Sequence, residues 1–109
     1  MDLTQQKCVP CEGGVKPFDT SEIQLYQSYL KTTWEINDNK KIEKKFTFKG
    51  FKDAIAFVNK VAEIAESEGH HPDMEISYNV VEIEIWTHAI GGLSVNDFIL
   101  ARKIESIIV

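Results

Sequence analysis

The chain has 109 residues, a formal net charge of -5, 43% hydrophobic residues and 27% charged residues. This length suits one domain, and this composition is typical of a folded protein. The acidic balance argues against non-specific nucleic-acid binding, which needs lysine and arginine to neutralise phosphates. No apolar run reaches the roughly 18 to 20 residues that span a bilayer, and the N-terminus has no hydrophobic signal core. We therefore expect a cytoplasmic protein without a membrane or nucleic-acid partner.

The first 18 residues contain two prolines and two glycines, which predicts an irregular N-terminal arm over residues 1–18 and a single domain over residues 19–109. The arm holds both cysteines, Cys8 and Cys11, in a Cys-Val-Pro-Cys sequence. A redox pair normally follows a strand and opens a helix, and a zinc site would need two more ligands, which only the histidines could supply. We favour a reduced structural pair, with metal binding and redox chemistry as alternatives.

Hydrophobic periodicity predicts a helix and a hairpin after the arm. Asp19 and Glu22 form a helix N-cap signature, and apolar residues then recur at helical spacing, which predicts a helix over about 20–32. Residues 34–48 alternate between apolar and polar side chains around a turn at Asp38-Asn39. This pattern is typical of a β-hairpin with one buried face.

A second helix is predicted from residue 51, because the apolar residues change to a period of 3.6. Gly69 has the character of a left-handed C-cap, and Pro72 prevents the helix from continuing. Glu66 therefore falls in the last turn. The apolar stripe of this helix is expected to comprise Phe51, Ala54, Ile55, Val58, Val61, Ala62 and Ala65.

The alternation of residues 74–78 and 81–85 predicts a second hairpin that turns near Asn79. Such a turn places residues 70–72 and residue 88 at the same end of adjacent strands, which brings His88 towards the other two histidines. The strand Val80 to Thr87 is strongly β-prone, and at a sheet edge it would favour a homo-oligomer.

A last helix is predicted after the Gly91-Gly92 loop, with Ser94 as its cap and Asp97 at the third position. Its buried face is expected to comprise Phe98, Ala101, and Ile104 or Ile108. The order is helix, two strands, helix, two strands, helix. It predicts an α+β fold in which three helices pack on one face of a four-stranded antiparallel sheet.

The three histidines of the chain all lie between residues 70 and 88. Imidazoles suit general acid and base catalysis, since histidine titrates near neutral pH. Metal binding is a second interpretation, although the usual closely spaced ligand pairs are missing. A third is structural, with the histidines capping a helix end and filling polar gaps. Their convergence with carboxylates favours a functional site.

Four other candidate residues each have an ordinary structural explanation. Asp97 follows Ser94 at the spacing of a capping box, and Glu66 is equally consistent with a solvated helix position. Tyr78 and Trp86 are aromatic residues of kinds common in cores and on surfaces.

The spacing of these residues closely resembles the pterin-4a-carbinolamine dehydratase family. The resemblance covers nearly the whole chain and includes the Cys-Val-Pro-Cys-Glu-Gly-Gly opening of bacterial-type members, Trp34 and the Gly-Gly-Leu-Ser loop. The matching pattern is Glu66, three residues, His70-His71-Pro72, five residues, Tyr78, nine residues, His88, eight residues, Asp97.

The resemblance implies a homodimer or homotetramer that dehydrates 4a-hydroxy-tetrahydrobiopterin to the quinonoid dihydropterin, without a metal or redox cofactor. This reaction recycles the cofactor of aromatic amino acid hydroxylases. Alternatives are a dimerisation cofactor that binds another protein, as some animal members do, and a Cys/His metal-binding protein.

The resemblance also assigns roles to the candidate residues. It implies His70 and His88 as the acid and base pair, in an order that stays open because a coupled pair titrates as a unit. His71 would chiefly bind the pterin, and Glu66 would orient and polarise a histidine. Asp97 would support the site from the last helix. Tyr78 and Trp86 complete the candidates for substrate binding.

Overall fold

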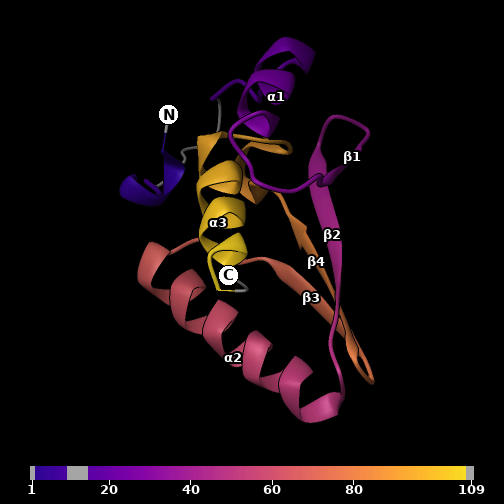
Figure 1. Cartoon of the computed structure of the whole chain (residues 1–109). Helices are drawn as coiled ribbons and strands as arrows, with labels where there is room; N and C mark the ends of the chain where they lie inside the picture. Colours follow the sequence, from indigo (N-terminus) through magenta and orange to yellow (C-terminus); the bar gives the residue numbers. More distant parts are fainter. Residues whose placement is uncertain (1, 10–14, 108–109) are drawn as a thin grey trace.

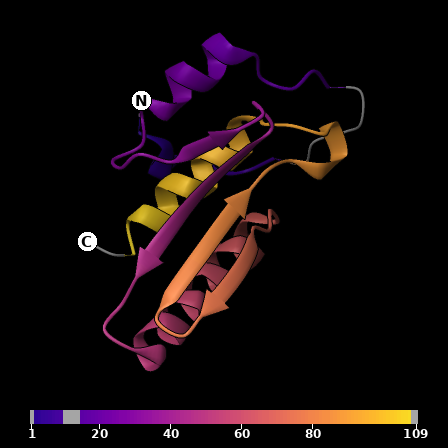
Figure 2. The same cartoon turned by 90° about the vertical axis from the view of Figure 1, so that its right-hand side faces the viewer.

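The computed structural model describes residues 2–9 and 15–107. A four-stranded antiparallel sheet runs in the order β1-β2-β4-β3, and the helices lie on one of its faces (Figures 1 and 2). The predicted α+β fold is confirmed. No helix in the described part of the chain is long and apolar enough to cross a membrane. The elements are η1 (Leu3–Gln5), α1 (Thr20–Gln27), β1 (Glu35–Asn37), β2 (Lys41–Thr47), α2 (Phe51–Glu68), β3 (Asp73–Ser77), β4 (Val80–Ile85), η2 (His88–Ile90) and α3 (Val95–Glu105).

The first helix is shorter than its sequence predicts, because it ends at Gln27 and not near residue 32. The buried carboxylate of Glu105, at the end of α3, accepts hydrogen bonds of 2.9 Å from the backbone N–H groups of Lys31 and Thr32 and one of 3.0 Å from the Trp34 indole. These donors would otherwise serve a continuing helix. A contact remote in sequence therefore keeps the helix from extending to residue 32 and directs the chain into β1, after turns at Tyr29 and Leu30.

The two hairpins turn where the alternation predicts. Asp38 and Asn39 both have positive φ, and so does Tyr78 at the second turn. Strand β4 does not lie at a sheet edge, the position at which it would favour a homo-oligomer. It pairs with β2 on one side and with β3 on the other. The sheet edges are β1 and β3, so β4 cannot offer an edge to a second subunit.

The core lies between the sheet and the helices. Helix α2 buries Ala54, Phe57, Val61 and Ala65, while Phe51 is 53% exposed, so the buried stripe is rotated from the expected one. Helix α3 is buried along most of its length because η1, α1 and α2 all contact it. Its predicted residues Phe98, Ala101 and Ile104 are buried, and Ile108 lies outside the described residues.

Candidate active site

The histidines meet because two chain segments leave regular structure at the same end of the sheet. Gly69 ends α2 with φ of 65°, and the N–H of His70 closes the helix on the carbonyl of Ala65 at 3.2 Å. Strand β3 begins three residues later and pairs with β4. At the end of β4, Thr87 pairs with Gly92, which closes a short loop that begins with His88.

This end of the sheet carries a cavity of about 470 Å³. That volume lies in the range of small-molecule sites. All three histidines contribute to its lining, as the hairpin geometry predicts. The lining residues are Val9, Gly69, His70, His71, Pro72, Asp73, Trp86, Thr87, His88, Ala89 and Asn96.

His70 is held by the carboxylate of Asp97, which is 0% exposed. The distance from His70 Nε2 to Asp97 Oδ1 is 2.6 Å. An ionised carboxylate can only accept, so Nε2 donates this hydrogen bond and Nδ1 is the ring nitrogen that remains for a ligand. A buried carboxylate beside one imidazole nitrogen selects the tautomer and stabilises the ring when it gains a proton.

The second oxygen of Asp97 performs the helix capping that the sequence predicts. Oδ2 accepts hydrogen bonds from the Ser94 backbone N–H at 2.8 Å and from the Thr87 hydroxyl at 2.9 Å. The Ser94 hydroxyl lies 2.9 Å from the Thr87 hydroxyl. It donates to Thr87, because the Thr87 hydroxyl already donates its single proton to Asp97. One carboxylate therefore both caps α3 and fixes His70.

His71 and Glu66 form a second, more exposed pair, with His71 Nε2 at 3.2 Å from Glu66 Oε1. An exposed ion pair adds little to stability. Both side chains are therefore free to adjust to a ligand. His71 lines the cavity, whereas Glu66 reaches it only through His71.

His88 lies against Trp86, with ring centroids 4.0 Å apart and planes inclined by 26°. The Trp86 indole N–H donates to Asp73 Oδ2 at 3.3 Å, and Lys41 Nζ lies 4.8 Å from the Trp86 ring centroid. These contacts limit the orientations of the indole and, through it, of the imidazole. The indole also presents apolar surface at the cavity.

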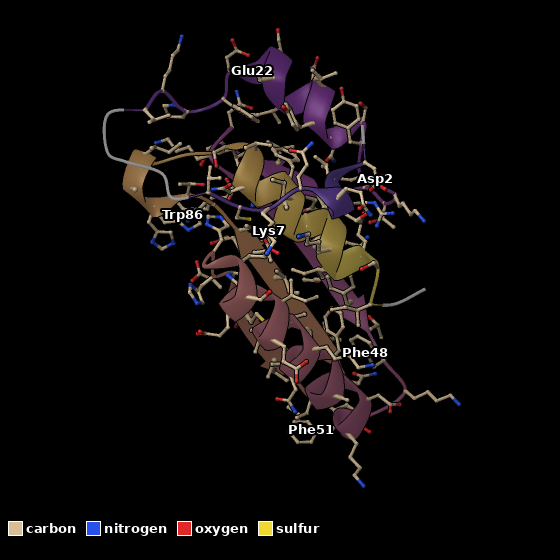
Figure 3. All side chains as sticks on the ribbon, turned by 90° about the vertical axis from the view of Figure 1, so that its left-hand side faces the viewer. Asp2, Lys7, Glu22, Phe48, Phe51 and Trp86 are labelled. Atoms are coloured by element: carbon tan, nitrogen blue, oxygen red, sulfur yellow. The ribbon has the colours of Figure 1, made fainter. Side chains whose placement is uncertain are left out.

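Tyr78 is the one candidate that the fold places far from the cavity. It occupies the β3–β4 turn, where Asn79 accepts a hydrogen bond of 2.8 Å from the Phe48 N–H, beside the start of α2. In Figure 3 Phe48 and Phe51 lie towards the lower end of the molecule, well away from Trp86. The role of Tyr78 stays a prediction.

The Cys8 side chain is half-buried, and its thiol does not ionise readily. Burial raises the pKa of its thiol to about 12, and the charge of Glu68 adds to this effect. Cys11 lies outside the described residues, so the structural pair stays a prediction, with metal binding and redox chemistry as its alternatives. Among the residues that the structure describes, no three His, Cys, Asp or Glu side chains form a group that could hold a metal ion.

The sequence did not single out five of the lining residues: Val9, Asp73, Thr87, Ala89 and Asn96. Asp73 and Thr87 are next to Pro72 and His88 in the chain, so proximity to a motif was an available signal. Asn96 likewise precedes Asp97, and Val9 follows Cys8, but only the packing of the arm against α3 brings Val9 to the cavity.

The fold and the site together define a small α+β protein with a histidine-lined cavity. The chain belongs to the pterin-4a-carbinolamine dehydratase family, since the family model described as Pterin 4 alpha carbinolamine dehydratase matches residues 16–107. Relatives from Rickettsia canadensis and Nitrosomonas europaea, both provisionally named pterin-4-alpha-carbinolamine dehydratase, are 50% and 47% identical over 95% of this chain and cover 95% and 91% of their own.

A solved structure supports the same assignment. The Brucella melitensis protein described as a transcriptional coactivator/pterin dehydratase is 31% identical to this chain. The two structures superpose with a TM-score of 0.78, and the match covers 84% of this chain and 98% of the Brucella chain.

Proposed function

We propose that this protein dehydrates pterin-4a-carbinolamines, with His70 and His88 as its acid and base pair. Its family and the names of its relatives support the reaction. The observation that carries the mechanism is the convergence of the two imidazoles on one cavity, with His70 Nε2 fixed at 2.6 Å from the buried Asp97.

The reaction requires a base at N5 and an acid at the hydroxyl on C4a. The base removes the N5 proton as a double bond forms between C4a and N5. The acid protonates the hydroxyl, the bond between C4a and oxygen breaks, and water leaves. No electrons are exchanged with another molecule, so the products are the quinonoid dihydropterin and water.

We assign the base to His70 and the acid to His88. With Nε2 donating to Asp97, the Nδ1 lone pair of His70 can accept the N5 proton, and the adjacent carboxylate stabilises the imidazolium that results. His88 then supplies a proton to the leaving hydroxyl from the Trp86 side of the cavity. His71 binds the pterin, and Glu66 orients His71 through their 3.2 Å contact.

The biological setting that we propose is recycling of the tetrahydrobiopterin cofactor of aromatic amino acid hydroxylases, in the cytoplasm and by a homodimer or homotetramer. The assembly is testable by light scattering. The protein-binding and metal-binding alternatives receive no support from a contact in the described part of the chain.

A stopped-flow assay on freshly generated 4a-hydroxy-tetrahydropterin tests the proposal. We expect wild type to accelerate dehydration and His70→Ala or His88→Ala to lose on the order of 10²-fold or more in turnover. Glu63→Gln, on an exposed position of α2, is the matched control and should retain full activity. Retained turnover in the double variant His70→Ala, His88→Ala would refute the mechanism, and an inactive wild type would refute the reaction.

A further inference from the structure

Residues 2–9 of the N-terminal arm pack on the domain. Leu3 is fully buried in the core, and η1 contacts α3. Figure 3 shows the arm at Lys7 crossing the molecule where α2 and α3 meet. From there the chain reaches Cys8 and Val9, which lie beside the cavity end of both helices.

Hydrogen bonds from both helices hold Cys8 and Val9. The Cys8 N–H donates to Glu68 Oε1 at 2.9 Å, at the end of α2. Asn96, in the first turn of α3, accepts from the Val9 N–H at 3.0 Å and donates through Nδ2 to the Val9 carbonyl at 2.5 Å. This two-way contact satisfies both backbone groups of Val9, as a neighbouring strand would.

The Val9 side chain is left free by these backbone contacts. It is 60% exposed and lines the same cavity as the histidines. An exposed valine held rigidly at a ligand cavity supplies apolar surface at little entropic cost on binding. The family model matches residues 16–107, so Val9 lies outside the matched range.

We propose that Val9 is a substrate-binding residue, and that Asn96 positions it as a wall of the cavity against which the pterin packs. This inference rests on the proposed function and adds a binding element from the arm to it. The wall contacts the pterin equally in the ground state and the transition state. It therefore contributes to affinity and not to the chemical step.

The test compares Val9→Ala with Val15→Ala. Val15 is the matched control, since it belongs to the same arm, is 51% exposed and is not among the residues that line the cavity. We measure the Kd for 7,8-dihydrobiopterin by equilibrium dialysis, and KM and kcat by stopped flow. Val9→Ala should raise Kd and KM about three- to tenfold with kcat within about twofold of wild type. Val15→Ala should match wild type.

Asn96→Ala tests the positioning role separately. In a Cys11→Ser background Cys8 is the single thiol, so the rate of its alkylation by iodoacetamide reports whether the segment stays docked. Asn96→Ala should accelerate alkylation about fivefold or more and raise the Kd at least as much as Val9→Ala does. An unchanged alkylation rate would overturn the positioning role of Asn96.

The outcomes separate the two proposals. If wild type binds the pterin and turns over substrate, and Val9→Ala binds the pterin with equal affinity, then the binding role of Val9 is overturned and the proposed function stands. A wild type that neither binds the pterin nor accelerates dehydration would overturn the proposed function, and the wall with it.

Discussion

Replacing Asp97 with asparagine should disable His70 while the fold is kept. The amide oxygen of the introduced asparagine can take the place of Oδ2 and accept from Ser94 and Thr87, which leaves the amide NH₂ facing His70 Nε2. His70 must then accept at Nε2 and carry its proton on Nδ1. This is the wrong tautomer for removing a proton from the substrate, so we expect turnover to fall on the order of 10²- to 10³-fold.

The cost in stability follows from the same contacts. Hydrogen bonds to a charged group contribute about 1.5–3 kcal/mol, against about 0.5–1.5 kcal/mol for neutral ones. The bonds from Ser94 and Thr87 remain but become neutral, so each contributes about 1 kcal/mol less to stability. The bond between His70 and residue 97 also becomes neutral and contributes less by a similar amount. The free energy of unfolding of Asp97→Asn, measured by urea titration, should therefore be about 2–4 kcal/mol below that of wild type. Glu63→Gln should be unchanged.

A double-variant cycle tests whether Asp97 acts through His70. In a His70→Ala background, Asp97→Asn should change the remaining turnover by less than about threefold, because its partner is already gone. A loss in that background as large as in wild type would refute the reasoning and show that Asp97 contributes to the reaction by another route.

Two further predictions concern the framework around the site. Burial raises the pKa of Glu68, but the Lys103 ammonium and the Cys8 N–H outweigh burial and lower this pKa below the usual 4.5. The stability that ionised Glu68 contributes is therefore present above pH 4.5 and is lost as the pH falls through the lowered pKa. In denaturant titrations Glu68→Gln should be less stable than wild type at pH 7, with a difference that shrinks towards pH 3, whereas a constant difference would exclude the carboxylate as its cause. A Cβ on Gly92 would lie 2.8 Å from Pro17 Cβ, so Gly92→Ala should lower the free energy of unfolding by about 1–3 kcal/mol. Most of this loss should vanish in a Pro17→Gly background, and a full loss there would contradict the clash.

Much of the fold followed from local chemistry. The capping residue Asp19, the left-handed Gly69 and the turn at Asp38-Asn39 each act within a few residues of chain, so their effect does not depend on the rest of the molecule. Hairpin geometry was enough to bring His88 towards the pair at the end of α2, because it needs only a strand alternation and a turn position. The family resemblance is confirmed by the match over residues 16–107.

Contacts between distant segments decided what local patterns could not. The path of the chain after α1 depends on Glu105, and the face that α2 buries depends on where the sheet and α3 lie, so neither is encoded nearby. The interior position of β4 follows from its pairing with β2, a choice between strands of similar character.

The sequence by itself determined the element order, the fold class and the cluster of histidines, since periodicity, turns and spacing are local properties of the chain. Only the tertiary structure decided that His70 pairs with Asp97 and His71 with Glu66. It also decided that the arm reaches the cavity. Side-chain pairing and docking depend on distances between segments far apart in the chain, and these distances are set when the helices pack on the sheet.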